Sequence, residues 1–339
     1  MESMCNFRPT YLKGIRFGSD NRKLCVGLWG MLWKEKPEIV IVPEFQISAI
    51  QVLLFRCIAG RKFKVVSMTD DSYDMIANNQ DFTKLHAWLR KHLAKYFDDF
   101  IVVTPEVKHW YQSNFHKGIW MPIIMDEVQA AAKYARLLHK SNEYVEQYGL
   151  KSKKIVLYVG RLVEIKNVSL LISAFNLIKE DSVLVIVGNG PERHSLEQQA
   201  ATSQKRIVFT GRFDGDALYA WYNVASVFVL PSYKEPFGAV TDEALLAGCR
   251  VVISQNAGSS CLVDNTNGEL VNPFDVQEIT DAIDRQLRLS QIPDLTFKRN
   301  SLRQVAFGDF PLASFYHRKN KQKYNKKFQE PGYTNLIIK

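Results

Sequence analysis

Five short apolar runs in the second half of the chain constrain the fold more than any other feature of the sequence. They are rich in valine and isoleucine, as buried strands are, and lie at 155–159, 183–187, 207–209, 227–230 and 250–253. Helical stretches separate them, at 168–179, 191–201, 216–224 and 239–247. Each connection is long enough for one right-handed crossover between parallel strands. The pattern therefore predicts a doubly wound, Rossmann-type α/β domain.

The first 125 residues show a weaker form of the same alternation. We expect strands at 38–42, 63–68, 100–103 and 118–122, and helices at 24–33, 46–59, 82–97 and from Pro105 onward. Thr104 is a good N-cap for the last of these helices. Alternating strands and helices indicate a parallel sheet with both faces covered.

The fold class expected for the whole chain is therefore α/β, with two Rossmann-type parallel-sheet domains facing across a cleft. The N-terminal domain is expected at 1–125, joined by a C-terminal helix at 311–328, and the C-terminal domain at 151–310. A polar, alanine-rich helix at 126–150 is expected to link the two domains.

Composition excludes several classes of protein. No apolar run approaches the ~20 residues of a membrane span, and residues 1–6 lack the basic and apolar regions of a signal peptide. The five cysteines include no CxxC pair, so the sequence indicates neither a zinc site nor a disulfide framework. We expect a cytoplasmic protein.

Basic residues concentrate at 317–327 in a chain of formal net charge +9. A solvated helix face is the simplest interpretation of this segment. Two sharper interpretations are contact with the anionic inner face of the cytoplasmic membrane and binding of nucleic acid. Nucleic acid is the weaker of these, because the sequence contains no recognisable nucleic-acid-reading module.

Ligand-binding residues are expected beyond the carboxyl ends of the strands, where doubly wound sheets bind their ligands. After the strand at 155–159, Gly160 permits close approach of a ligand, and Arg161 and Lys166 supply cations that suit a diphosphate. A basic turn facing water is the alternative for these cations. After the strand at 183–187, Gly188 and Gly190 form a tight turn that opens a helix.

The later strand ends add an aromatic ring and two carboxylates. Phe213, beside Arg212, could flank a planar base. Glu235 and Glu243 lie at the mouth and on the first turns of the helix at 239–247. Carboxylates suit sugar hydroxyls rather than phosphates, whereas the first amides of the helix suit an anion. Those amides belong to Phe237, Gly238, Ala239 and Val240.

This set of strand ends resembles the C-terminal half of the retaining glycosyltransferases of family 4, the group 1 enzymes of the GT-B fold. The resemblance rests on residues 159–166, 187–192, 209–212 and 235–244. The spacing of Glu235 and Glu243 matches the E-x7-E element of the family. The likeness covers residues ~150 to 290.

The resemblance implies a metal-independent hexosyltransferase that takes a nucleoside-diphosphate sugar, such as a UDP-sugar, and a glycan or lipid-linked glycan acceptor. Neither a cofactor nor a metal is expected. Arg161 and Lys166 would neutralise the diphosphate and the charge on the leaving nucleotide. Glu243 would bind the ribose, and Glu235 the transferred sugar. The expected donor-binding residues are Gly160, Arg161, Lys166, Gly188, Gly190, Arg212, Phe213, Glu235, Phe237, Gly238, Ala239 and Glu243.

The expected catalytic residues are Arg161, Lys166 and Glu235 together with Asp71 of the N-terminal domain. Asp71 follows a predicted strand, where the family often has a histidine beside the reacting sugar. A solvated loop acid is an equal alternative for this residue.

The sequence departs from the family at several points. Ile165 and Asn167 flank Lys166 where the family has Glu and Gly, and the small-residue loop 256–260 lacks the pattern Gly-Gly-x-x-Glu. The N-terminal domain looks about two strands short, either because the recorded start is internal or because the chain is a shortened variant. A degenerate, non-catalytic nucleotide-sugar-binding or scaffold protein is therefore the alternative to an active transferase.

Overall fold

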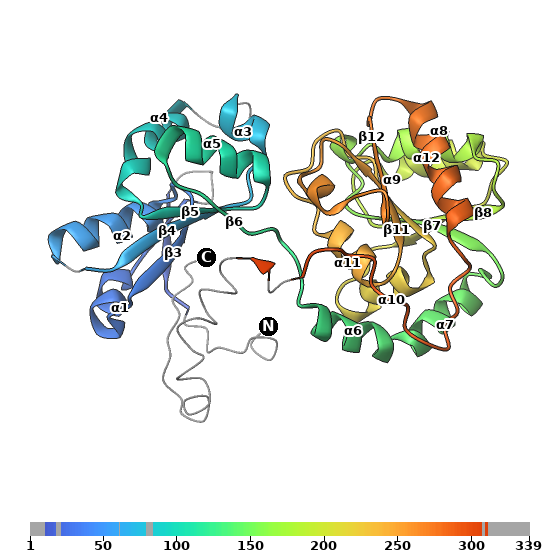
Figure 1. Cartoon of the computed structure of the whole chain (residues 1–339), viewed down its shortest axis with the longest axis horizontal. Helices are drawn as coiled ribbons and strands as arrows, with labels where there is room; N and C mark the ends of the chain where they lie inside the picture. The colour runs from blue at the N-terminus through green and yellow to red at the C-terminus, as the bar shows by residue number, and fades with distance from the viewer. Residues whose placement is uncertain (1–10, 18–21, 61, 79–83, 307–308, 311–339) are drawn as a thin grey trace. The chain divides into compact units, whose positions relative to one another are not determined.

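The computed structural model describes residues 11–17, 22–60, 62–78, 84–306 and 309–310. The predicted terminal helix at 311–328 and the basic segment at 317–327 lie outside this part of the chain. The chain divides into two compact units (Figure 1). Unit 1 is Met1–Met121 with Phe310–Lys339, and unit 2 is Pro122–Asp309.

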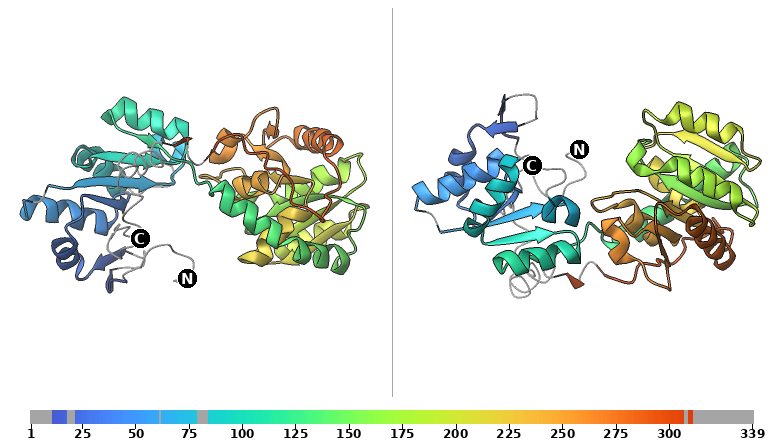
Figure 2. Two further views of the ribbon diagram at one scale, coloured as in Figure 1. Left: turned by 60° about the horizontal axis from the view of Figure 1, so that its bottom comes forward. Right: turned by 90° about the horizontal axis from the view of Figure 1, so that it is seen from above.

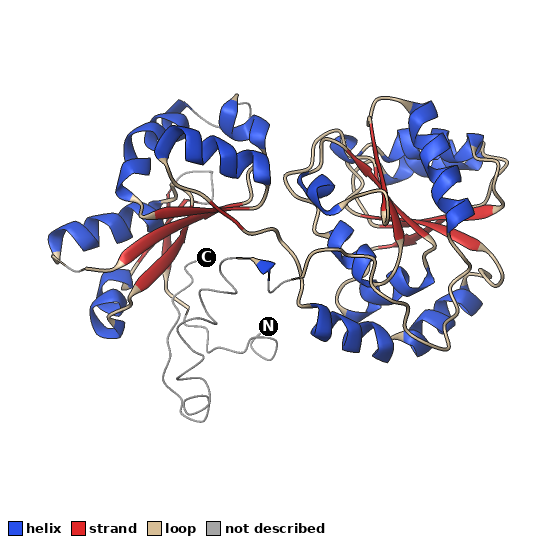
Figure 3. Cartoon of the chain, viewed as in Figure 1, coloured by secondary structure: helices blue, strands red, loops and turns tan. Residues whose placement is uncertain are grey.

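Unit 1 contains a four-stranded parallel sheet whose strands follow one another in sequence order. Figure 3 draws the strands in red and the helices in blue. The strands are β3 (Ile39–Pro43), β4 (Lys64–Thr69), β5 (Asp99–Val102) and β6 (Ile119–Trp120). The helices are α1 (Leu28–Glu35), α2 (Ile47–Ile58), α3 (Tyr73–Ala77), α4 (Lys84–Leu93) and α5 (Pro105–Phe115), with the 3-10 turn η2 (Ala94–Tyr96) after α4. As expected, the Thr104 hydroxyl caps α5 by accepting a hydrogen bond from the Val107 amide (3.4 Å).

In the described part of unit 1, the crossover helices lie on one face of this sheet. A sheet that grows in one direction places its right-handed crossover helices on one face. The buried core accordingly unites Leu32 of α1, Val52 of α2, Val65 of β4 and Val107 of α5 in a single cluster. On the other face of the sheet Met68 is 39% exposed.

An antiparallel pair of strands precedes the parallel sheet of unit 1. It consists of β1 (Gly14–Phe17) and β2 (Arg22–Cys25), which pair with each other rather than with the sheet. The pair lies beside α2 (Figure 2), where the Gln51 side chain exchanges two hydrogen bonds with the backbone of Cys25 (3.0 and 3.2 Å). No periodic signal in the sequence indicated this pair.

Unit 2 contains a six-stranded parallel sheet with the order β12-β11-β10-β7-β8-β9. The predicted strands are β7 (Lys154–Val159), β8 (Ser182–Val187), β9 (Ile207–Gly211), β10 (Val227–Leu230) and β11 (Arg250–Ser254), and β12 (Gly268–Val271) was not foreseen. The order reverses at β7, which pairs with both β8 and β10. That reversal is the topological switch point at which such sheets bind ligands.

Helices cover both faces of the sheet in unit 2, because the winding changes direction. Figure 1 shows α8, α9 and α12 on one side and α6, α7, α10 and α11 on the other. Their bounds are α6 (Glu127–Arg136), α7 (Leu138–Gln147), α8 (Val168–Leu177), α9 (Arg193–Ala201), α10 (Asp216–Val224), α11 (Val240–Leu246) and α12 (Val276–Leu289). The 3-10 turns are η3 (Glu164–Lys166) and η4 (Gly258–Leu262).

The stretch 126–150, expected as one linking helix, forms two helices that belong to unit 2. The Asp126 carboxylate caps α6 by accepting a hydrogen bond from the Gln129 amide (2.8 Å). Tyr134 and Tyr144 are buried against the rest of the unit. In the described part of the chain, no helix combines the length and apolar character needed to cross a membrane.

Candidate functional site

The loops that follow β7 and β10 bring two predicted site residues into direct contact. Lys166 ends η3, and Glu235 follows β10; their side chains form an ion pair between Nζ and Oε2. The loops are also tied through the backbone, because the Tyr233 amide donates to the Ile165 carbonyl (2.9 Å). Because β7 and β10 are neighbours in the sheet, residues 69 positions apart meet at the switch point.

Asn167 explains why the loop tolerates the loss of the family's glycine after Lys166. Its backbone is left-handed, with φ 58° and ψ 36°, and asparagine is one of the few residues that adopt this conformation at low cost. Its buried amide Nδ2 donates to the carbonyls of Pro231 (3.1 Å) and Pro273 (2.7 Å). These two hydrogen bonds of Asn167 therefore hold the loop that carries Lys166 against the end of β10.

Gly188 and Gly190 are required for the packing of one loop on another. A Cβ atom at Gly188 would lie 1.9 Å from the carbonyl oxygen of Gly160, and one at Gly190 would lie 2.1 Å from that of Leu162. No side chain fits at such distances. The two glycines therefore set the position of the loop that carries Arg161, and their contact with a donor stays a prediction.

Arg161 is exposed beside Gly160, and its guanidinium forms no ion pair or hydrogen bond with any described residue. Its carbonyl oxygen accepts a hydrogen bond from the Tyr158 hydroxyl (3.1 Å), which holds the backbone in place. The switch point thus has one unpaired cation, Arg161, and one paired cation, Lys166.

The turn from Glu235 into α11 depends on Gly238, whose φ of +89° is left-handed. The loop 256–260 packs against this turn through the backbone, because the Gly258 amide donates to the Glu235 carbonyl (3.0 Å). Phe237 is buried, so only its backbone could reach a ligand. Ala239 occupies the N-cap position of α11 and provides no side-chain cap.

Glu243 lies on the first turn of α11 and accepts hydrogen bonds from two tyrosines of α10. The Tyr222 hydroxyl donates to Oε2 (2.6 Å) and the Tyr219 hydroxyl to Oε1 (3.2 Å). Burial raises the pKa of the Glu243 carboxyl, and these two hydrogen bonds oppose the rise. A carboxylate has about four acceptor positions, so Glu243 keeps capacity for further hydrogen-bond donors.

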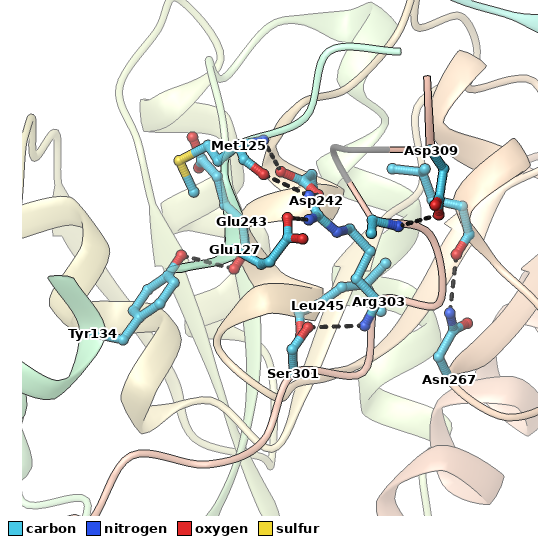
Figure 4. A network of polar contacts seen from close by, with 12 residues as sticks. Met125, Glu127, Tyr134, Asp242, Glu243, Leu245, Asn267, Ser301, Arg303 and Asp309 are labelled. Atoms are coloured by element: carbon cyan, nitrogen blue, oxygen red, sulfur yellow. Dashed lines mark hydrogen bonds and ion pairs between the residues drawn. The ribbon is translucent and has the colours of Figure 1, made fainter. Parts of the chain in front are cut away.

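A buried polar network fixes the helix that carries Glu243 (Figure 4). Arg303 donates to the Asp242 carboxylate (2.9 Å), to the Met125 carbonyl (2.7 Å) and to the Glu127 carboxylate (2.6 Å). Asp242 in turn accepts a hydrogen bond from the Met125 amide (2.8 Å). The side chains of Arg303 and Asp242 are only 2% and 1% exposed. No motif in the sequence indicated this network.

Arg212 and Phe213 follow β9, the edge strand, which β8 separates from β7. The Arg212 guanidinium forms an exposed ion pair with Asp214 (3.1 Å). The Phe213 ring packs against Tyr144 (centroids 5.5 Å apart) and Trp221 (6.0 Å). A contact of Phe213 with a nucleotide base stays a prediction, and the observed role of its ring is packing.

Asp71 belongs to a separate polar cluster in unit 1, at the carboxyl ends of β3 and β4. Arg90 of α4 donates to both oxygens of the buried Glu44 (2.9 and 3.2 Å) and lies 3.7 Å from Asp71. The Tyr111 hydroxyl also donates to Glu44. With a side chain only 17% exposed, Asp71 is not the solvated loop acid of the alternative interpretation.

The two carboxyl groups of this cluster share one proton. Burial and the neighbouring Glu44 raise the pKa of Asp71 to about 8. Burial alone would raise the pKa of Glu44 too, but hydrogen bonding from Asp71 and the charge of Arg90 lower it. Asp71 is therefore the protonated member at neutral pH and donates to the Glu44 carboxylate.

The raised pKa of Asp71 makes the stability of unit 1 dependent on pH. The folded state holds this proton up to about pH 8, whereas the pKa of an ordinary aspartate carboxyl is 3.8. The stabilisation from this proton is complete below the pKa that Asp71 has in the unfolded state. It is lost as the pH rises through the pKa that Asp71 has in the folded state. We expect the free energy of unfolding to fall by up to about 1.4 kcal/mol per pH unit within this window.

Replacing Asp71 with asparagine should flatten this slope, because the amide donates to Glu44 at every pH. Urea unfolding at several pH values, followed by tryptophan fluorescence, measures this slope. The fluorescence reports on unit 1 because that unit holds five of the six tryptophans. Asp74→Asn, at an exposed acid of α3, is the matched control. An unchanged slope in Asp71→Asn would contradict the shared proton.

Among the residues that the structure describes, no three His, Cys, Asp or Glu side chains gather into a group that could hold a metal ion.

Residues 153–288 match the family model of the glycosyl transferases group 1. Unit 2 contains a group 1 glycosyltransferase domain. The domain is 39% identical over 141 residues to an uncharacterized glycosyltransferase of Methanocaldococcus jannaschii, across 40% of this chain and 36% of that protein. It is 30% identical over 166 residues to the 2-deoxystreptamine N-acetyl-D-glucosaminyltransferase of Niallia circulans, across 44% and 42%. The chain thus spans less than half of these relatives.

A longer but weaker likeness extends beyond the group 1 glycosyltransferase domain. The UDP-Gal:alpha-D-GlcNAc-diphosphoundecaprenol alpha-1,3-galactosyltransferase of Escherichia coli is 26% identical over 296 residues, which is 82% of this chain and 73% of that protein. Among solved structures, sucrose-phosphate synthase of Thermosynechococcus elongatus has a TM-score of 0.63 at 21% identity, across 86% of this chain and 75% of that one.

Anabaena HepE, solved with UDP and glucose, gives the same TM-score of 0.63 at 21% identity, across 81% of this chain and 75% of that one. At this level of identity the two solved structures establish the fold alone. They confirm the expected α/β class and GT-B fold. With the match at 153–288, they also confirm the resemblance to the group 1 glycosyltransferases.

Proposed function

We propose that this glycosyltransferase moves a hexose-type sugar from a nucleoside-diphosphate sugar to a glycan or lipid-linked glycan in polysaccharide biosynthesis. The transfer would retain the anomeric configuration and need no metal. The observation that carries the proposal is the meeting of Lys166 and Glu235 at the switch point, beside the unpaired Arg161. A site with two cations and a carboxylate accommodates a diphosphate joined to a sugar.

In the proposed reaction, the bond between the anomeric carbon and the diphosphate oxygen breaks while the acceptor oxygen bonds to the same face of that carbon. The acceptor proton passes to the departing diphosphate. Arg161 and Lys166 stabilise the negative charge that grows on the leaving group. Glu235 accepts hydrogen bonds from the sugar, and Glu243 accepts them from the ribose.

A UDP-sugar is our first choice of donor, and a lipid-linked glycan our first choice of acceptor. HepE was solved with UDP, and the name of the E. coli relative specifies UDP-Gal and a diphosphoundecaprenol acceptor. Such acceptors lie in a membrane. We therefore place the protein at the cytoplasmic face, where the basic segment at 317–327 would contact anionic lipid.

Donor binding tests the role of Glu243. We expect Glu243→Gln to raise the dissociation constant of the donor about 10- to 100-fold, because each hydrogen bond to a charged group contributes about 1.5–3 kcal/mol. Calorimetry with UDP- and GDP-sugars measures the effect. Glu197→Gln, at a carboxylate of α9 that pairs with Arg193, is the matched control.

Equal donor affinity in Glu243→Gln and the parent protein would contradict the assignment of the ribose site. Nucleotide release is then followed with glycan and lipid-linked acceptors. Donor binding without turnover on every acceptor would support the alternative, a nucleotide-sugar-binding protein that does not transfer.

A further inference from the structure

Helix α4 and the turn η2 expose a set of apolar and basic side chains on the surface of unit 1. Leu85 is 52% exposed, Trp88 54% and Tyr96 52%. Lys84, Lys91 and Lys95 are exposed on the same stretch. We call these six residues the basic α4 face. Single exposed apolar residues are normal, but three with three lysines within 13 residues call for an explanation.

The spacing places four of these side chains in one stripe along α4 and the turn η2 that follows it. Positions 84, 88, 91 and 95 recur at intervals of four, three and four, the spacing of one helical stripe. The opposite side of α4 packs against the rest of unit 1. There Leu89 and Leu93 pack against the core, and Arg90 binds Glu44. The side chains of the basic α4 face therefore take no part in the core of unit 1.

The charge of this stretch has one sign. No aspartate or glutamate occurs from residue 84 to residue 97. The next acid along the chain, Asp98, is paired with Arg56 (2.6 Å). The surface thus selects against cationic partners and favours anionic ones.

The aromatic rings are arranged beside the cations. Trp88 stacks on His92 with ring centroids 4.5 Å apart, and the Lys95 ammonium lies 5.0 Å from the ring centroid of Tyr96. Tryptophan and tyrosine favour the level of lipid headgroups, where one part of the ring is apolar and the other wet. Lysine stems bury their methylenes there and keep the charge in water.

We propose that the basic α4 face binds an anionic bilayer surface. Lys84, Lys91 and Lys95 would contact the headgroups, while Leu85, Trp88 and Tyr96 would enter the interface. Each lysine near an anionic membrane strengthens binding about fivefold. The contact needs neither donor nor acceptor, so its failure would leave the proposed sugar transfer untouched.

Vesicle co-sedimentation of the full chain tests the charge dependence. The vesicles are phosphatidylcholine alone, or phosphatidylcholine with an equal part of phosphatidylglycerol. We expect the triple variant Lys84→Gln, Lys91→Gln and Lys95→Gln to weaken binding to the anionic vesicles about 100-fold. The control triple, Lys34→Gln, Lys36→Gln and Lys64→Gln, removes three exposed lysines of the same unit and should change little.

Lipid contact is also proposed for the basic segment at 317–327, so the comparison is repeated in a chain whose lysines and arginine there are replaced by glutamine. The loss caused by the α4 substitutions should persist in this background. If neutralising 317–327 abolishes vesicle binding and the α4 variant binds like the parent, the proposal is overturned. Equal losses from both triple variants would overturn it too.

Tryptophan quenching by brominated lipid locates the contact. Quenching should fall in Trp88→Phe and remain in Trp33→Phe, because Trp33 is 57% exposed but lies on α1, outside the basic α4 face. Quenching that survives Trp88→Phe would overturn the proposal. So would binding to RNA without binding to anionic vesicles.

Discussion

Replacing Lys166 with alanine is expected to lower the turnover number for sugar transfer about 100- to 1,000-fold. The ammonium group sits where negative charge would grow on the leaving diphosphate, and loss of one such group typically costs about 2.7–4 kcal/mol in the transition state. The variant also leaves Glu235 without its ion pair. Nucleotide release under saturating donor measures the effect.

Two control variants separate the charge of Lys166 from other effects. Lys166→Arg keeps the cation and should retain most activity, and Lys179→Ala removes an exposed lysine of the same unit. A Lys166→Ala enzyme with an unchanged turnover number and a raised KM would contradict the prediction. That result would mean that Lys166 binds substrate and transition state equally.

The fold of unit 2 could be predicted because local patterns carried the information. Each buried strand is a run of apolar residues, and each strand end has its own turn chemistry. Parallel topology then brings the strand ends to one edge. That logic brings the loops of Lys166 and Glu235 to the same edge, although the residues are 69 positions apart, but it did not foresee their ion pair.

Other parts of the site could not be predicted, because their residues have no pattern of their own. Asn167 replaces the glycine of the family, but its backbone adopts the left-handed conformation that glycine favours. Tyr219 and Tyr222 of α10 belong to no motif, but both donate to Glu243. Contacts of this kind depend on side-chain directions, which the period of a helix does not specify.

The topology of unit 1 could not be predicted from the sequence either. The alternation of strands and helices predicted a parallel sheet, and the sheet formed. The sequence did not reveal the order of the strands, and that order determines which face the helices cover. The cluster of Glu44, Asp71 and Arg90 was likewise hidden, because its members lie on three different elements.

Replacing Arg303 with methionine is expected to destabilise unit 2 by about 3–5 kcal/mol. The substitution leaves the Asp242 carboxylate buried without its cation, and removing one partner of a buried ion pair has a cost of this size. Hydrogen exchange of peptides from α6 and α11 in increasing urea reports on unit 2 alone. Because α11 carries Glu243, donor affinity should fall together with stability.

Arg285→Met is the matched control, because Arg285 pairs with Glu269 at 2.6 Å but is 49% exposed. An exposed pair contributes about 0–1 kcal/mol, so this variant should stay close to the parent. In the double variant Arg303→Met with Asp242→Asn, much of the stability should return, since no unpaired charge is then buried. If Arg303→Met and Arg285→Met cost the same, the network of Arg303 does not hold α11 in place.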